Sequence, residues 1–150
     1  MNYRHTASFG KRIEYYIIGL MLKEGLDCYL PMVDDDGIDV VIRRNDNEFI
    51  SVQIKARSKS VKNGNCALFA ALTHQEIRNN YFFVFYSERL DTMWIMSSEE
   101  YLKECVTNKT GVNQGKTSIC LSGKKNGQEY PLPRFDKYIS ANDFSRLKLN

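Results

Sequence analysis

Two runs of β-branched residues, joined by a short polar turn, constrain this chain more than any other feature. Residues 38–57 read IDVVIRRNDNEFISVQIKAR, and apolar and polar residues alternate on both sides of the turn. Side chains along a strand point to opposite faces in turn, so the pattern predicts an antiparallel hairpin of residues 38–44 and 49–57. One face of this hairpin is apolar and must pack against other parts of the chain.

Three polar residues, Asp39, Gln53 and Lys55, interrupt the apolar runs of this hairpin. Alternation places Gln53 and Lys55 together on the face opposite the aliphatic residues of their strand. Asp39 can join them only if residues that face each other across the hairpin are both odd-numbered or both even-numbered. A plain two-residue turn forbids this pairing. We therefore expect an odd loop, such as residues 46–48, or a β-bulge. The same alternation puts Ile38, Val40 and Ile42 on the buried face.

A carboxylate, a carboxamide oxygen and an ammonium group on one face form a recognisable chemical set. Mg²⁺ prefers oxygen ligands in octahedral geometry and keeps several waters when a substrate phosphate completes its shell. Asp39 and Gln53 supply such oxygens, together with the backbone carbonyl of Ile54. Lys55 is placed to orient or deprotonate an attacking water and to neutralise charge on a phosphate. The hairpin therefore predicts a site for Mg²⁺ or Mn²⁺.

Apolar residues recur at helical spacing over residues 9–24, which predicts a helix capped by Thr6 or Ser8 and ended by Gly25. Glu14 lies on this helix, which is apolar almost all round. A carboxylate in such surroundings requires a partner.

The remaining pattern alternates strands and helices. We expect a mixed β-sheet flanked by helices, an α/β or α+β fold, in a single domain with a core of residues 9–105 and an extension of residues 106–150. In the extension we expect mobile loops, with one edge strand at residues 117–121. The other expected elements are a strand near residues 28–32, an acidic turn at 33–37, strands at 81–87 and 92–97, a helix capped by Ser97 or Ser98, and short helices within 135–149.

Charge and composition narrow the function classes. The net charge is only +3, and the longest apolar run, residues 15–22, is too short to span a bilayer. The N-terminus lacks a secretory signal pattern, so we expect a cytoplasmic protein. The four cysteines form no C-x-x-C pair, which argues against a zinc ribbon or a redox motif. His5 and His74 have no ligand spacing, and Asp34–Gly37 lacks the pattern of an EF-hand loop.

A basic stretch follows the hairpin along the chain. Such a stretch suits a phosphate backbone, although a solvated face or a guarded edge strand gives the same pattern. Its members are Arg43, Arg44, Lys55, Arg57, Lys59 and Lys62.

Together these motifs resemble the PD-(D/E)XK nuclease superfamily. The matching residues are GID ending at Asp39, QIK from Gln53 to Lys55, and GKRIE ending at Glu14. Gln53 replaces the usual acidic residue, and this Q-x-K variant is similar to Mrr-type restriction enzymes, Holliday junction resolvase-like proteins and some homing endonucleases. The resemblance covers residues 9–57 and implies a restriction-endonuclease-like fold.

The resemblance also implies the reaction and the roles of residues. It implies hydrolysis of DNA phosphodiester bonds, with Asp39 as the main metal ligand, Glu14 near the metal, and Gln53 and Lys55 completing the catalytic set. Phosphates would be gripped by basic residues of the hairpin and its flank: Arg43, Arg57, Lys59 and Lys62. Cutting both strands requires two sites, which a homodimer or higher homo-oligomer supplies. Two alternatives stay open: a nucleic-acid-binding module of this fold without turnover, and an immunity or regulatory domain that binds another protein.

Overall fold

A mixed β-sheet forms the centre of the molecule. The computed structural model describes residues 3, 7–62 and 64–149. Within these residues the main sheet has five strands in the order β1-β2-β3-β5-β6. β3 and β5 run parallel, and the other neighbouring pairs are antiparallel. The strands are β1 (Asp27–Tyr29), β2 (Val40–Asn45), β3 (Glu48–Arg57), β5 (Tyr81–Ser87) and β6 (Thr92–Ser97).

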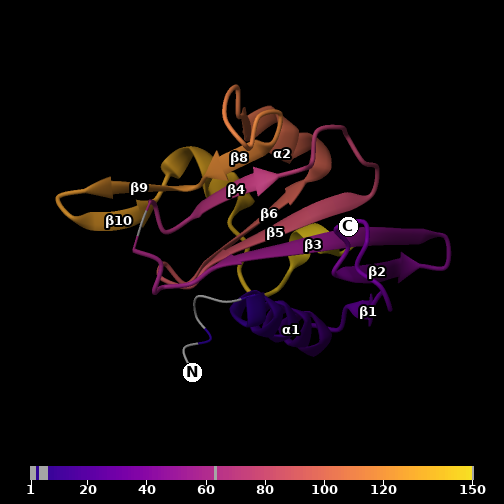
Figure 1. Cartoon of the computed structure of the whole chain (residues 1–150). Helices are drawn as coiled ribbons and strands as arrows, with labels where there is room; N and C mark the ends of the chain where they lie inside the picture. The colour runs from indigo at the N-terminus through magenta and orange to yellow at the C-terminus, as the bar shows by residue number, and fades with distance from the viewer. Residues whose placement is uncertain (1–2, 4–6, 63, 150) are drawn as a thin grey trace.

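Different elements cover the two faces of this sheet (Figure 1). Helix α1 (Ala7–Lys23) lies on one face, and a three-stranded sheet and helix α2 (Ser98–Glu104) lie on the other. The three-stranded sheet has the order β4-β8-β7, and β9 and β10 form a separate hairpin. The remaining bounds are β4 (Leu68–Leu72), β7 (Val106–Thr107), β8 (Thr117–Cys120), β9 (Ser122–Lys125), β10 (Gln128–Pro131) and the 3₁₀ helices η2 (Pro133–Tyr138) and η3 (Ser145–Leu147). The expectation of a mixed sheet with helices against it is confirmed.

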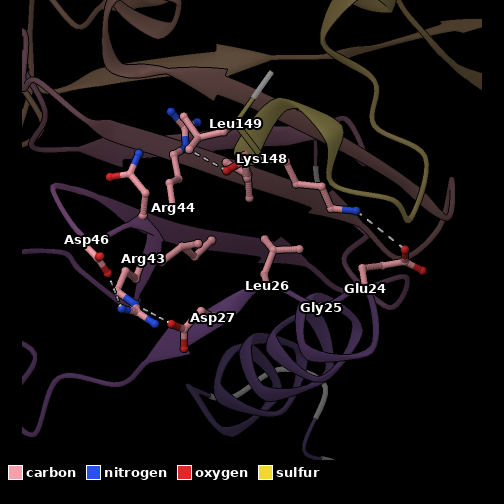
Figure 2. A pocket seen from close by; sticks show the side chains of 12 residues that line it. Glu24, Gly25, Leu26, Asp27, Arg43, Arg44, Asp46, Lys148 and Leu149 are labelled. Carbon is pink, nitrogen blue, oxygen red and sulfur yellow. Dashed lines mark hydrogen bonds and ion pairs between the residues drawn. The ribbon is translucent and has the colours of Figure 1, made fainter.

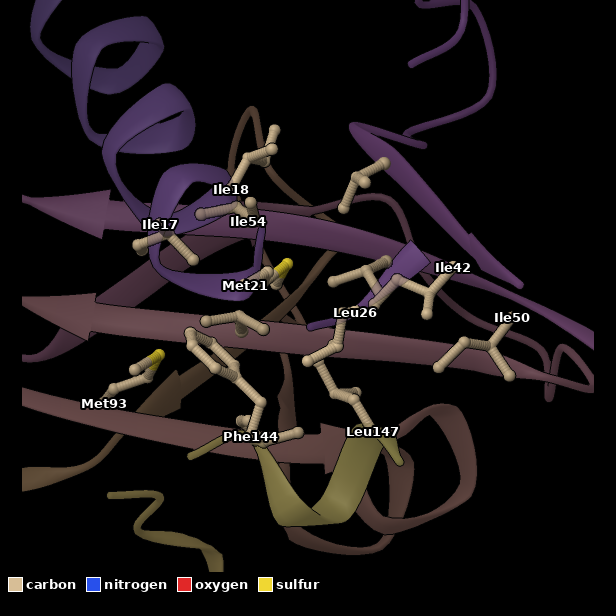
Figure 3. Close-up of a cluster of buried hydrophobic side chains, with 14 residues drawn as sticks. Ile17, Ile18, Met21, Leu26, Ile42, Ile50, Ile54, Met93, Phe144 and Leu147 are labelled. Atoms are coloured by element: carbon tan, nitrogen blue, oxygen red, sulfur yellow. The ribbon is translucent and has the colours of Figure 1, made fainter. Parts of the chain in front are cut away.

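Helix α1 packs its apolar stripe on the main sheet. Ile17 and Met21 are fully buried there, and Figure 3 shows them facing the aliphatic residues of β2 and β3. Phe144 and Leu147 close the same cluster from the C-terminal segment. The predicted helix is confirmed, and Gly25 follows it with a φ of +83°, which suits glycine.

The predicted helix cap differs from the structure. Ser8 lies inside α1, one residue after its start, so it is not the cap. Thr6 lies outside the described residues. Helix α2, by contrast, begins as expected: Ser97 accepts a hydrogen bond from the Glu100 amide, and Glu100 accepts one from the Ser97 amide.

The second face of the main sheet carries an aromatic core. The rings of Phe83 and Phe85 on β5 stack 5.3 Å apart, and Tyr101 of α2 lies 4.7 Å from Phe83. Phe69 of β4 and Trp94 of β6 join the same cluster. The alternation of aromatic residues along β5 and β6 therefore reflects packing on this face.

The pairing of β2 and β3 confirms the expected irregular register. Val40 faces Val52 and Ile42 faces Ile50, so facing residues share the same number parity. A bulge between Arg43 and Asn45 makes this parity compatible with a two-residue turn.

Ile38 departs from its predicted face. It packs against the aromatic cluster, whereas Val40 belongs to the aliphatic cluster beneath α1. A bend at Asp39, just before β2, breaks the alternation between them.

The C-terminal third is more ordered than its sequence suggested. The expectation of mobile loops around one edge strand is wrong, because residues 122–131 form a hairpin and β8 is the central strand of its sheet. Ile119 and Leu121 are buried in the aromatic cluster, which supplies the energy for this order. The short helices expected near the end are present as η2 and η3.

The described residues contain no helix with the length and apolar content needed to cross a bilayer.

The packing of α1 on the sheet gives a test of the fold. Replacing the fully buried Ile17 by alanine removes contacts with the sheet and should lower the free energy of unfolding by about 2–5 kcal/mol. Leu22→Ala, on the same helix but 56% exposed, should change it by less than about 0.5 kcal/mol. Chemical denaturation of both variants measures this difference, and equal losses would contradict the packing described.

Candidate active site at the start of β2

Asp39 is fixed to β3 at two points. Its backbone N–H donates to the Val52 carbonyl at 2.9 Å, and its Oδ2 accepts from the Ile54 amide at 2.6 Å. Val52 and Ile54 flank Gln53, so Asp39 sits beside the QIK segment where β2 begins. The carboxylate is half-buried and does not enter the aliphatic core.

Glu14 reaches the same place from helix α1. Its side chain is 13% exposed and lies within hydrogen-bonding reach of the Asp39 carboxyl. Lys11, one helical turn earlier, donates to Glu14 Oε2 at 2.7 Å. A small pocket of about 80 Å³ is lined by Lys11, Glu14, Asp34 and Asp39. The structure therefore brings Glu14 and Asp39 together in one pocket.

The surroundings of Asp39 alter its acidity. The pKa of Asp39 is raised from 3.8 to about 7, mainly by burial and in part by the nearby Glu14 and Asp34 carboxylates. The hydrogen bond from the Ile54 amide acts in the opposite direction. Close carboxylates that repel one another in a partly buried pocket are the arrangement that a divalent cation relieves.

Gln53 lines a second depression, of about 460 Å³, which Glu14 and Asp39 do not line. The hydroxyl of Tyr81 donates to the Gly37 carbonyl at 2.6 Å and contacts Gln53 Oε1 at 3.1 Å. A Cβ on Gly37 would lie 3.0 Å from Gln53 Nε2, and Gly37 has a φ of +66°. Glycine is therefore required for the close approach of this turn to Gln53.

Tyr81 is itself held by its neighbours. The Arg78 guanidinium lies 4.1 Å from the ring centre and donates to the Asp36 carbonyl at 2.8 Å. The His74 ring stacks on the Tyr81 ring with 5.3 Å between the ring centres, and His74 Nε2 lies 2.6 Å from Ser98 Oγ. Burial raises the pKa of Tyr81 to about 12, so its hydroxyl keeps its proton at neutral pH.

Ile54 and Lys55 follow Gln53 on β3. In a strand, the N–H and C=O of one residue point to the same side, so the Ile54 carbonyl points toward β2, as its amide does. β2 begins opposite Val52, so the Ile54 carbonyl lies beyond the last paired residues of the β2–β3 ladder. Lys55 is half-buried on the face that Gln53 shares.

The predicted phosphate-binding residues fall into two groups. Arg57 ends β3 and donates from Nε to the Asn65 carbonyl at 2.8 Å, and Lys59 and Lys62 lie on the loop that follows. Arg43 lies at the opposite end of the hairpin. The Arg43 guanidinium pairs there with Asp27 at 2.7 Å and with Asp46 at 3.2 Å, as Figure 2 shows. The structure thus does not bring Arg43 to the other three.

A larger depression, of about 550 Å³, surrounds Arg43 and Arg44 at that far end (Figure 2). Arg44 donates from Nε to the Leu147 carbonyl at 2.9 Å, and Lys148 pairs with Glu24 at 3.9 Å. These contacts hold the C-terminal segment on the sheet. The charged residues here are engaged in structural contacts and lie away from Asp39.

The sequence assigned no role in the site to three residues that the structure places there: Lys11, Gly37 and Tyr81. The sequence contains a signal for the role of Lys11, because a lysine three residues before a glutamate on a helix lies on the same face as that glutamate. Tyr81 had none, because its contact with Gln53 arises from the parallel pairing of β3 and β5.

The candidate site has few acidic side chains that could serve as metal ligands. Among the described residues no three His, Cys, Asp or Glu side chains lie together in a group that could hold a metal ion. Glu14 and Asp39 line one pocket, and Gln53 lines another. Carboxylate, carboxamide and backbone carbonyl oxygens are hard donors of the kind that Mg²⁺ takes alongside water and phosphate.

Comparison with known proteins identifies the fold. No protein-family model matches the chain, and no curated protein does. A solved structure, described as that of the bacterial homing endonuclease I-Ssp6803I, matches with a TM-score of 0.58 and 23% identity. The match covers 90% of this chain and 88% of that chain. The chain therefore has a nuclease-like fold.

The raised pKa of Asp39 predicts how stability depends on pH. Without metal, the folded state binds the Asp39 proton more tightly than the unfolded chain, so stability falls as pH rises from 3.8 to about 7. Asp39→Asn removes this loss and should stabilise the protein by about 1 kcal/mol at about pH 8, a figure reduced for partial solvent exposure. The gain should shrink at about pH 5.

Thermal unfolding in EDTA across this pH range measures the effect. Asp136→Asn, at an exposed aspartate on η2, is the matched control and should leave the pH dependence unchanged. A gain for Asp39→Asn that is the same at every pH would show that the Asp39 carboxyl does not titrate as described.

Proposed function

We propose that this protein is a metal-dependent endonuclease that hydrolyses DNA phosphodiester bonds, as restriction, homing and junction-processing enzymes do. The observation that carries the proposal is the meeting of Glu14 and Asp39 beside the QIK segment of β3. The nuclease-like fold, matched over 90% of the chain, supports it. On this reading the protein is a Q-x-K variant of the PD-(D/E)XK superfamily.

The residues present fit Mg²⁺ or Mn²⁺. We propose Asp39, Glu14, Gln53 and the Ile54 carbonyl as the groups that would hold it. When bound, such a cation would act as a Lewis acid toward the phosphate and lower the pKa of water. Because Gln53 is neutral, the set carries two negative charges at most, which favours one cation over two.

The protein's own groups have separate roles in this proposal. Asp39 must lose its proton before it can ligate a cation, and a pKa of about 7 makes that loss depend on pH near neutrality. Lys11 neutralises part of the Glu14 charge through its 2.7 Å contact. Lys55 would orient or deprotonate the attacking water and stabilise charge on the phosphate.

Basic residues beyond Lys55 extend the site toward the phosphate backbone. Lys59 and Lys62 are available for phosphates on the loop after β3, and Arg57 orders the same loop through Asn65. Arg43 is paired with two aspartates at the far end of the hairpin, so we assign it to the fold and leave it out of this proposal.

Cleavage of supercoiled and branched DNA with Mg²⁺ or Mn²⁺ tests the reaction. We expect nicked or linear products from the wild-type protein and a loss of about 10²–10⁴-fold in Asp39→Asn and Lys55→Ala, because each removes a group that acts on the reacting phosphate or water. Asp136→Asn and Lys109→Ala, at exposed positions elsewhere, are the matched controls.

The outcomes separate the three function classes. Cleavage that survives in both Asp39→Asn and Lys55→Ala contradicts the proposed site. Salt-sensitive binding to DNA without cleavage assigns the protein to the binding modules. Absence of both binding and cleavage at low salt leaves the protein-interaction alternative.

The contact of Tyr81 with Gln53 gives a second test. Tyr81→Phe removes the hydroxyl that joins Gln53 to the Gly37 carbonyl, so the Mg²⁺ concentration for half-maximal cleavage should rise by about tenfold. Tyr86→Phe removes a hydroxyl from the same strand, where it contacts Asp91, and is the matched control. An equal Mg²⁺ requirement in both variants would show that Tyr81 does not position Gln53.

A further inference from the structure

The β9–β10 hairpin carries basic side chains that the proposed active site does not use. It extends from one end of the molecule, at the left in Figure 1. Lys124 and Lys125 lie at the end of β9 and are exposed, as are Asn126, Gly127 and Gln128 at the tip. Residues 122–131 belong to neither core cluster, so their basic side chains are available to a partner.

The base of this hairpin is firmly held. The Leu132 amide donates to the Leu121 carbonyl at 2.9 Å, and Ser122 Oγ accepts from the Ala67 amide at 3.1 Å. A Cβ on Gly123 would lie 3.0 Å from the Tyr130 ring, so Tyr130 folds closely across the ribbon. The protruding tip is therefore carried on a fixed base.

The tip itself is a tight two-residue turn. Asn126 and Gly127 have φ values of 52° and 77°, which match the turn that joins twisted antiparallel strands most compactly. Lys125 pairs with Gln128 across this turn. The ribbon is thus two strands wide at its end, a width that the major groove of duplex DNA, about 12 Å across, admits.

Arg89 joins the hairpin to the basic loop after β3. Its Nη1 contacts both oxygens of Glu129 on β10 at 3.0 Å, and its Nη2 donates to the Lys59 and Val61 carbonyls, the former at 2.8 Å. Glu129 faces Lys124 across the hairpin. One guanidinium therefore holds Lys59 and Lys124 on adjoining parts of the surface.

The lysines of this surface lie outside the ion pairs that engage several arginines. In residues 7–62 and 64–149, the ammonium groups of Lys59, Lys62, Lys124 and Lys125 form no ion pair within 4.0 Å, and Arg89 engages the Glu129 carboxylate that lies opposite Lys124. Several arginines elsewhere are paired with carboxylates: Arg43 with Asp27, Arg44 with Glu48, Arg134 with Glu104 and Arg146 with Glu100. Lysines without an ion pair, beside Arg89, form a surface suited to phosphates.

We propose that the β9–β10 hairpin enters a groove of duplex DNA, with Lys124 and Lys125 contacting phosphates on either side and Asn126 and Gln128 reaching the base edges. This proposal rests on the proposed function, since it gives the same DNA a second contact beyond the metal site. Lys59 and Lys62 continue the phosphate contacts from the hairpin toward β3. Arg89 is a positioning residue that sets the hairpin against that loop.

The salt dependence of duplex binding tests the hairpin. In an Asp39→Asn background, which blocks cleavage, Lys124→Ala/Lys125→Ala should lower affinity for a labelled duplex by at least about tenfold. The slope of log K against log salt should fall by about 1.8, because two phosphate contacts are lost. Lys124→Arg/Lys125→Arg should keep both the affinity and the slope.

The matched control removes the same charge elsewhere. Lys23→Ala/Lys109→Ala changes two exposed lysines, one at the end of α1 and one on the loop after β7, and should leave the slope unchanged. If both double-alanine variants lose duplex affinity and salt slope equally, the effect comes from net charge alone and the hairpin proposal is overturned. If single-stranded DNA binds as tightly as the duplex and loses the same affinity in Lys124→Ala/Lys125→Ala, the hairpin does not act by entering a duplex groove.

Measurements on the wild-type protein distinguish a failure of the hairpin proposal from a failure of the proposed function. If wild-type protein cleaves DNA and Lys124→Ala/Lys125→Ala binds with unchanged slope, the hairpin proposal fails alone. If wild-type protein neither cleaves nor binds a duplex at low salt, the proposed function fails, and the hairpin proposal with it. Thermal unfolding of each variant shows that a loss of binding reflects the surface and not the fold.

Discussion

The double attachment of Asp39 to β3 is the constraint on which the site depends. Its backbone bonds to Val52 and its carboxylate to the Ile54 amide, so the chain must bend at Asp39 before β2 can begin. The bend turns Ile38 toward the aromatic core and Val40 toward α1. A half-buried carboxylate is left between the two cores, where solvation is poor. Such a position is costly for a carboxylate and is consistent with a functional role.

Helix α1 and the Tyr81 side chain of β5 contribute to the site from opposite faces of the sheet. α1 delivers Glu14 because Ile17 and Met21 anchor the helix on the aliphatic core. β5 delivers Tyr81, whose hydroxyl holds the Gly37 turn against Gln53. The side chains that bury apolar surface therefore also position the polar groups. The contacts that stabilise the fold thus set the geometry of the site.

Much of this arrangement was predictable from local pattern. The hairpin, its irregular register, the α1 stripe and the role of Gly25 follow from side-chain alternation and helical spacing. The positions of Glu14, Asp39 and Gln53 on those elements followed with them. The structure differed where contacts join distant segments: β4 was not predicted, β8 proved central, and Arg43 found aspartate partners at the far end of the hairpin. Gly-, Asn- and Lys-rich sequence around residues 122–131 suggested loops, yet burial of Leu121 and Tyr130 packing on Gly123 order a hairpin there.

The sequence by itself determined which residues alternate, which face of each element is apolar, and which side chains can carry acid, base or phosphate chemistry. Those properties are local, because they depend on backbone periodicity and on the side chains themselves. Only the tertiary structure decided that Glu14 meets Asp39, that Tyr81 holds Gln53, and that Arg89 sets the basic hairpin beside the loop after β3. These contacts join residues far apart in sequence, and packing of the two cores on one sheet is what brings them within reach.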